Sequence, residues 1–201
     1  VGVIHAGIVT APGLRVGLLG GSFDPPHEGH VHITRWALRA FALDQVWWVV
    51  SPGNPLKARG PADLARRMAA CRDIIRHPRV HVTDIESRLG TRYTADTLAA
   101  LRHRYRALRF VWLMGADNLA SFHRWERWQW IIETMPIGVL ARPDQQLRAA
   151  LAPAARRYSA RRLPGHAAQM LPVRRAPCWT LLTGPMSAQS SSEIRSAGHW
   201  P

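Results

Sequence analysis

Short apolar runs alternate along most of the chain with longer segments in which apolar residues recur every three to four positions. Residues 15–20 form an apolar run, residues 28–41 follow the helical period, and residues 45–50 form a second apolar run. Further helices are predicted at 62–76 and 94–105, and further strands at 80–82, 109–114, 137–140 and 179–182. Strands that alternate with helices predict a parallel sheet with helices on both faces.

The chain shows no internal repeat and no internal linker, which predicts an α/β fold with a single doubly wound domain over residues 15–201. Residues 1–14 precede the first strong strand and are interpreted as an N-terminal extension that adds little to function. The stretch 142–175 is rich in Ala, Arg and Pro and predicts a helix plus irregular chain, whereas residues 190–196 open a short helix. A chain of 201 residues can bury a core without disulfides or a structural metal.

Composition narrows the classes of partner and compartment. The net charge is +14, almost all of it from arginine, because Lys57 is the only lysine. The arginines are spread along the chain and form no basic arm, which favours a phosphate-rich small substrate over nucleic acid, although nucleic-acid binding stays an alternative. Cys71 and Cys178 lie in no disulfide or zinc pattern, so we expect a reducing, cytoplasmic setting. We expect no membrane span and no signal peptide, since no apolar run approaches about 18 residues.

The sharpest chemical signal is the loop Gly-Gly-Ser-Phe-Asp-Pro-Pro-His-Glu-Gly-His at residues 20–30, between the first strand and the first helix. In open α/β sheets, ligands bind beyond the carboxyl ends of the strands, and a helix N-terminus there offers free N–H groups to phosphate. Gly20 and Gly21 let the backbone approach an anion closely, and Ser22 adds a hydroxyl donor. The loop therefore predicts a phosphate site.

Two histidines open the predicted helix. His27 and His30 are three residues apart, so their side chains lie on one face and could point at the same phosphate chain. The prolines and glycines around the pair indicate an exposed loop and make buried core histidines a weak alternative. His32 falls on another side of the helix and no HExxH pattern exists, so no metal ligands are predicted among the protein side chains.

The loop resembles the GxFDPxHxGH signature of the HIGH-type nucleotidyltransferase superfamily, which implies a Rossmann-like fold. Three further stretches are similar to the bacterial nicotinate-nucleotide adenylyltransferase family: Arg-Tyr-Thr-Ala-Asp-Thr-Leu at 92–98, Gly-Ala-Asp-Asn-Leu at 115–119 and Ser-Ser-Ser-Glu-Ile-Arg at 190–195. The chain departs from that family where Arg92 and Ser192 replace Ser and Thr, and where Leu56 replaces a common His. These departures leave the overall resemblance in place over residues 15–195.

The resemblance implies two sets of binding residues. ATP would contact Gly20, Gly21, Ser22, Phe23, His27, His30, Ser190, Ser191, Ser192 and Arg195. The mononucleotide would contact Lys57, Tyr93, Thr94, Asp117, Trp125 and Arg142. In the family, the backbone at the Tyr-Thr pair holds the pyridine carboxylate, the tryptophan stacks on the ring and the last arginine grips the triphosphate. By residue type alone, Thr94 is a good helix N-cap and Ser190 to Glu193 an ordinary capping box, and these structural interpretations stay open.

The activity that the resemblance implies is transfer of the adenylyl group of ATP to nicotinate mononucleotide, with His27, His30 and Arg195 as catalytic residues. Mg²⁺ is expected to arrive with ATP, because no carboxylate cage is evident in the sequence. Three alternatives stay open: a phosphopantetheine acceptor, a nicotinamide-preferring relative, and a nucleotide-sensing or nucleic-acid-binding module without turnover. The sequence also leaves open whether the protein forms a homo-oligomer.

Overall fold

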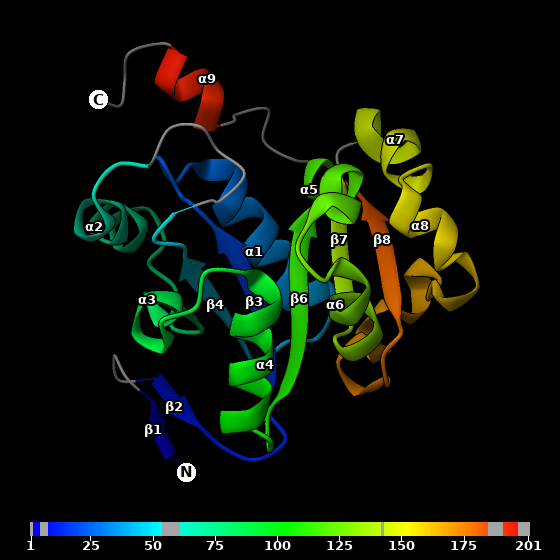
Figure 1. Ribbon diagram of the computed structural model, residues 1–201, viewed down its shortest axis with the longest axis horizontal. Helices are drawn as coiled ribbons and strands as arrows, with labels where there is room; N and C mark the ends of the chain where they lie inside the picture. The colour runs from blue at the N-terminus through cyan, green and yellow to red at the C-terminus, as the bar shows by residue number, and fades with distance from the viewer. Residues whose placement is uncertain (1, 5–7, 54–60, 142, 185–190, 197–201) are drawn as a thin grey trace.

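The centre of the molecule is a six-stranded parallel sheet (Figure 1). The computed structural model describes residues 2–4, 8–53, 61–141, 143–184 and 191–196. The strands are β3 (Arg15–Gly21), β4 (Gln45–Val50), β5 (Val80–Thr83), β6 (Arg109–Gly115), β7 (Ile137–Ala141) and β8 (Trp179–Thr183). They lie in the order β5-β4-β3-β6-β7-β8, so the predicted doubly wound sheet is confirmed.

Helices cover both faces of the sheet. One face carries α1 (Glu28–Ala40), α2 (Leu64–Ile74) and η5 (Gly165–Val173). The other carries α3 (Ile85–Leu89), α4 (Thr94–Arg104), α5 (Ala116–Ser121), η2 (Phe122–Arg124), α6 (Trp128–Thr134) and α8 (Pro153–Arg157). The remaining elements are η3 (Pro143–Gln145), α7 (Gln146–Ala150), η4 (Ser159–Arg161) and α9 (Ser191–Ser196). In the part of the chain described here, no helix is both long and apolar enough to cross a bilayer.

The helices predicted from the periodicity are present within a few residues of their expected bounds. The sequence analysis missed α3, whose five residues are too few to show a helical period. The Ala- and Arg-rich segment before β8 forms several short helices rather than one, because Pro153, Pro164 and Pro172 each interrupt or begin a turn.

The strand order places a crevice between β3 and β6. The chain leaves β3 toward β4 on one side and leaves β6 toward β7 on the other, so the loops after β3 and β6 diverge at the carboxyl ends of two neighbouring strands. Leu19 pairs with Leu113, which brings the loop beginning at Ser22 beside the start of α5. Ligands of open α/β sheets bind at such a switch point.

Two tryptophans in β4 pack into the core on opposite faces of the sheet. Trp47 and Trp48 are fully buried, and the two-residue period of the strand places them on opposite faces. The Trp48 indole N–H donates to the Thr34 hydroxyl of α1 at 2.7 Å, and that hydroxyl donates to the His30 carbonyl at 2.8 Å. This chain of bonds ties the first turns of α1 to the sheet.

Residues at the N-terminus form an antiparallel pair of strands that the sequence analysis did not predict. β1 (Gly2–Ile4) pairs with β2 (Ile8–Thr10) at the lower end of the molecule in Figure 1. Ile8 is only 1% exposed and belongs to the same core cluster as the apolar side chains of α4. The Gln45 side-chain amide donates to the Val9 carbonyl at 2.8 Å, which fixes β2 against the start of β4.

Ile8→Ala is expected to lower the free energy of unfolding by about 2–5 kcal/mol, because it removes buried methyl groups from a packed core. The matched control is Val9→Ala on the same strand, whose side chain is 51% exposed. That change should stay within about 0.5 kcal/mol. Urea unfolding of both variants makes the comparison, and equal small losses would show that the strand is not part of the core.

Candidate active site

The first site element is the loop after β3 and the start of α1. His27 is the N-cap of α1, with extended backbone angles, and Glu28 and Gly29 form the first turn. The Gly29 N–H donates to His27 Nδ1 at 3.1 Å, and the His27 N–H donates to His30 Nδ1 at 3.2 Å. The two imidazoles therefore make a reciprocal capping box, and their ring centroids lie 4.0 Å apart.

These two hydrogen bonds set the tautomer of both rings. A neutral imidazole has one N–H donor and one acceptor, and in both rings Nδ1 is the acceptor. The proton of each ring is thus assigned to Nε2. The N-terminus of α1 consequently presents two side-chain N–H donors where its backbone dipole already favours an anion.

His30 is held neutral. Burial lowers its pKa to about 3, with a further contribution from the neighbouring His27. The Phe23 ring lies 4.7 Å from the His30 ring and stacks on Trp48 at 4.8 Å between centroids. Phe23 is 1% exposed and Asp24 8% exposed, so the expectation of an exposed loop around the histidines is wrong for these residues. The Phe23 side chain packs against His30, and its predicted contact with ATP would have to come from its backbone.

The glycines of the loop are required by aromatic packing as well as by any close approach of an anion. A Cβ on Gly20 would lie 2.3 Å from the Trp112 ring, and one on Gly21 would lie 3.3 Å from the Phe23 ring. Trp112 is 3% exposed and comes from β6, so the absent side chain of Gly20 is what lets the two central strands pack at the switch point.

Arg195 connects the two segments of the predicted ATP site, which are far apart in the sequence. Its guanidinium donates to the Asp24 carbonyl, and Nη1 lies 3.9 Å from Asp24 Oδ2, although the two residues are 171 positions apart. In Figure 1, α9 accordingly lies above the carboxyl ends of the strands, next to the start of α1. The structure therefore brings Arg195, His27 and His30 to the same end of the sheet.

The start of α4 corrects one expectation. Tyr93, not Thr94, is the N-cap, and Thr94 is the first helical residue. No side chain caps the helix, while the Tyr93 carbonyl accepts from the Asp96 and Thr97 amides at 3.0 and 3.1 Å. The uncapped first amides of an eleven-residue helix are available to a ligand carboxylate.

The residues expected to recognise the mononucleotide surround the other side of the switch point. Trp125 is half-buried and contacts Phe122 and Trp112 edge to face, with centroids 5.4 and 6.2 Å apart. Asp117 is exposed in the first turn of α5, directly after β6. An Arg127–Asp96 ion pair of 2.9 Å joins the start of α6 to the first turn of α4, and so links the Trp125 segment to the Tyr93 turn.

Some of the predicted contacts cannot be placed. Lys57, Arg142 and Ser190 lie outside the described residues, and for Ser191 and Ser192 only the start of α9 is described. Within the described ranges, no three His, Cys, Asp or Glu side chains gather in a way that could hold a metal ion.

Comparison with known proteins identifies the family. Residues 18–197 match the cytidylyltransferase-like family model. A Ruegeria pomeroyi protein named "Probable nicotinate-nucleotide adenylyltransferase" is 61% identical over 94% of this chain and 89% of its own length. A Cereibacter sphaeroides protein of the same name is 63% identical over 92% of this chain and 98% of its own length. The chain belongs to the nicotinate-nucleotide adenylyltransferase family.

The fold agrees with that assignment. A solved Plasmodium falciparum nicotinic acid mononucleotide adenylyltransferase, complexed with NaAD, superposes with a TM-score of 0.69. The match covers 91% of this chain and 83% of that one at 16% sequence identity, so it supports the fold alone. The family, the enzyme class and the doubly wound fold predicted from the sequence are confirmed.

The sequence analysis missed Arg67, which organises the loops of this nicotinate-nucleotide adenylyltransferase family member. Arg67 is 1% exposed and donates to the carbonyls of Ser22 at 2.6 Å, Ser51 at 2.7 Å and Ala62 at 2.6 Å. Burial lowers its pKa, while the nearby Asp24 opposes that shift. One guanidinium thus joins the loops after β3 and β4 to the start of α2. The available signal was its position three residues after Leu64 on the apolar side of α2.

Glu86 is the second missed residue. Its side chain is buried on α3, and burial raises the pKa of its carboxyl while hydrogen bonds from Ser51 and Thr97 oppose the rise. The Thr97 hydroxyl lies 3.4 Å from Glu86 Oε1 and 2.8 Å from the Thr91 hydroxyl. This network fixes the first turn of α4 against the loop after β4. It escaped detection because α3 itself was not predicted.

Arg67→Met is expected to lower the free energy of unfolding by more than about 3 kcal/mol, because it removes a buried guanidinium and leaves several part-buried carbonyls without a donor. It should also raise the KM for ATP, since the Ser22 loop loses its anchor. Arg67→Lys should restore only part of both, as lysine lacks the planar fork of five donors. Urea unfolding and steady-state kinetics measure the two effects.

The control for that experiment is Arg72→Met, an exposed arginine on the same helix, which should cost less than about 1 kcal/mol and leave the KM unchanged. Equal effects of Arg67→Met and Arg72→Met would contradict the anchoring role.

The low pKa of His30 predicts a pH-dependent contribution to stability. An unfolded histidine titrates near pH 6.5, whereas folded His30 titrates at about 3. Between these values the unfolded chain binds the extra proton, so the contribution is fully present above pH 6.5 and declines on acidification by up to about 1.4 kcal/mol per pH unit. Wild type should therefore lose stability more steeply than His30→Gln between pH 6.5 and 4 in urea unfolding. Parallel curves would refute a neutral buried His30.

Proposed function

We propose that this chain transfers the adenylyl group of ATP to nicotinate mononucleotide, giving nicotinate adenine dinucleotide and pyrophosphate. The observation that carries the proposal is the pair of imidazole Nε2–H donors at the N-terminus of α1, inside a chain of this family. Both donors and the helix dipole favour the polyphosphate of ATP at the switch point of the sheet.

The reaction needs no covalent intermediate on the protein. A phosphate oxygen of the mononucleotide attacks the α-phosphorus of ATP, a new P–O bond forms, and the bond from the α-phosphorus to the bridging oxygen breaks as pyrophosphate leaves. Such transfers depend mainly on positioning and on donors aimed at the developing charge. His27 and His30 supply such donors through their Nε2–H groups, and His30 does so in its neutral form at pH 7.

Arg195 supplies a permanent positive charge for the same polyphosphate. Its guanidinium is already bound to the Asp24 carbonyl, which holds it beside the loop. A guanidinium has five N–H donors in a planar fork, so it can keep this bond and still bind a phosphate oxygen. The contact of Arg195 with the loop thus adds a third donor group to the triphosphate site.

Mg²⁺ fits this arrangement as an ion delivered with ATP. The described residues hold no cluster of carboxylates for a resident ion, and Mg²⁺ commonly keeps its waters and binds substrate phosphates. When bound, it would neutralise charge on the triphosphate. Asp24 is a carboxylate of the same loop, and its contact with Arg195 assigns it to positioning that side chain.

The acceptor is recognised at the start of α4. Uncapped amides at Thr94 and Ala95 favour the carboxylate of nicotinate over the neutral amide of nicotinamide. Trp125 offers a ring for stacking, held by its edge contacts with Phe122 and Trp112. Acid specificity therefore depends on the helix start, and affinity for either ring depends on the tryptophan.

The test of this function is pyrophosphate release from ATP with each mononucleotide. We expect turnover with nicotinate mononucleotide and a kcat/KM at least tenfold lower with nicotinamide mononucleotide, because only the acid interacts with the uncapped amides as an anion. Trp125→Ala should weaken both acceptors and leave their ratio nearly unchanged. His30→Ala should reduce kcat by about 10²-fold while the protein stays folded, the scale of losing one preorganised donor.

Equal use of both mononucleotides would overturn the acceptor assignment. A collapse of the ratio in Trp125→Ala alone would overturn the division of roles between Trp125 and α4. Near wild-type kcat in His30→Ala would remove that residue from the mechanism.

A further inference from the structure

A basic groove lies at the end of the sheet opposite the active site. It is lined by the C-terminal turn of α4, the start of β6, and the segments just before β7 and β8, and it encloses about 720 Å³. In Figure 1 these elements meet at the lower end of the molecule, whereas α9 and the start of α1 lie at the upper end. The groove therefore does not belong to the site described above.

The lining of the groove is strongly positive. The basic side chains are those of Arg102, His103, Arg106, Arg109, Arg174 and Arg175. All six are exposed, and none of the five arginines forms an ion pair with another described residue. The one acidic residue of the lining, Glu133, accepts a hydrogen bond from the Tyr158 hydroxyl at 2.5 Å.

The end of α4 accounts for only part of this charge. A helix C-terminus carries roughly half a negative charge, which favours a cation or two in the last turn. Arg102 and His103 lie in that turn, but Arg174 and Arg175 come from the segment before β8. Arg106 donates to the His103 carbonyl at 3.3 Å. The convergence of three segments also brings in Arg109, Arg174 and Arg175, which form no ion pair with another described residue.

Size and lining indicate the class of ligand. A volume of about 720 Å³ lies in the range typical of small-molecule sites. Apolar side chains share the groove with the arginines, among them Leu108, Val173 and the partly exposed Tyr105. Arginines that bind phosphates beside apolar surface that can cover a base or ribose match the chemistry of a nucleotide.

We propose that this groove is a second binding site, for a nucleotide that carries a diphosphate or triphosphate. The lining arginines come from both the end of α4 and the segment before β8, and linked phosphates would give the two groups of arginines more than one anionic group to bind. A second copy of this chain is a poor occupant, because each copy carries a net charge of +14. The binding should weaken as salt rises, since every lining arginine is exposed.

The test is calorimetric titration of the full chain with inorganic tripolyphosphate at low salt. We expect two equivalents to bind to wild type and one to the double variant Arg106→Glu/Arg174→Glu, with at least a tenfold loss of affinity at the missing site. The kcat and the KM for ATP should be unchanged in that variant, because neither residue lies near the catalytic end. Competition by ATP and by NAD is then measured in wild type, at the site that the variant lacks. The stronger competitor distinguishes a triphosphate ligand from a dinucleotide.

The matched control is Arg148→Glu/Arg161→Glu, which changes the net charge equally at exposed arginines outside the groove and should keep both equivalents. A single equivalent in wild type, or two in the groove variant, would overturn the proposal.

A twelve-nucleotide oligothymidylate is the last probe. Loss of its binding in the groove variant, with both tripolyphosphate equivalents retained, would assign the groove to single-stranded nucleic acid and overturn the nucleotide site. Because catalysis is measured separately, failure here is distinct from failure of the proposed function.

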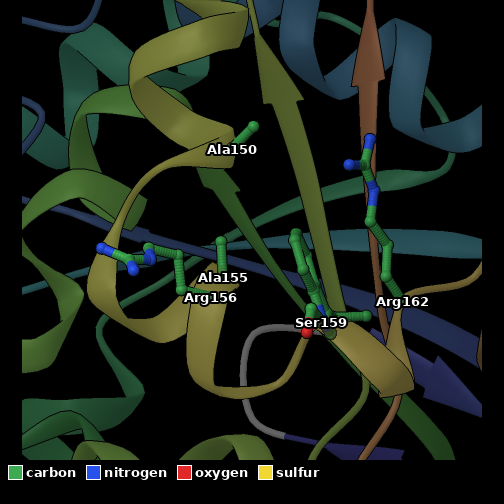
Figure 2. Close-up of a pocket in the computed structure, with 6 residues that line it drawn as sticks. Ala150, Ala155, Arg156, Ser159 and Arg162 are labelled. Atoms are coloured by element: carbon green, nitrogen blue, oxygen red, sulfur yellow. The ribbon is translucent and has the colours of Figure 1, made fainter.

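A smaller cavity of about 280 Å³ lies beside β8 and carries no comparable inference (Figure 2). Its arginine nearest the strand, Arg162, already lies 5.5 Å over the Trp179 ring and donates to the Leu181 carbonyl at 3.5 Å. That side chain is used in packing the edge of the sheet.

Discussion

Two backbone hydrogen bonds at the start of α1 determine what the rest of the site can do. The Gly29 and His27 amides both donate to imidazole Nδ1 atoms, and this direction leaves each Nε2 as a donor. In the other tautomer Nδ1 would carry the proton, and Nε2 would face the substrate as an acceptor and would repel phosphate. The bond from Trp48 through Thr34 to the His30 carbonyl, and the Phe23 ring below His30, hold that geometry against the sheet.

A second constraint is the burial of charge beside this turn. Arg67 lies among loop carbonyls rather than opposite a carboxylate, so its charge is stabilised by dipoles from three separate segments. Removing any one of these loops would leave a buried cation with fewer partners. The loops after β3 and β4 are therefore coupled to α2 through Arg67, a residue outside the histidine pair.

The two ends of the sheet carry different electrostatic features for one structural reason. In a parallel sheet all strands point the same way, so helix N-termini gather at the carboxyl end and helix C-termini at the other. The candidate active site lies at the N-termini of α1 and α4. At the opposite end the positive charge comes only from side chains, among them arginines at the end of α4 and before β8.

Periodicity along the chain was sufficient to predict β3, α1, β4 and β6, because strands buried on both faces are continuous apolar runs and amphipathic helices repeat every 3.6 residues. The local spacing of His27 and His30 likewise predicted their pairing, since three residues are one helical turn. Periodicity and local spacing could not predict contacts between distant segments. Arg195 meets Asp24, Arg67 meets Ser22, and Ile8 enters the core only because the sheet order brings those segments together. The sequence alone determined most of the elements and the pairing of two histidines at the start of α1. The tertiary structure alone decided which buried charge supports that turn, because burial is a property of packed neighbours and not of residue order.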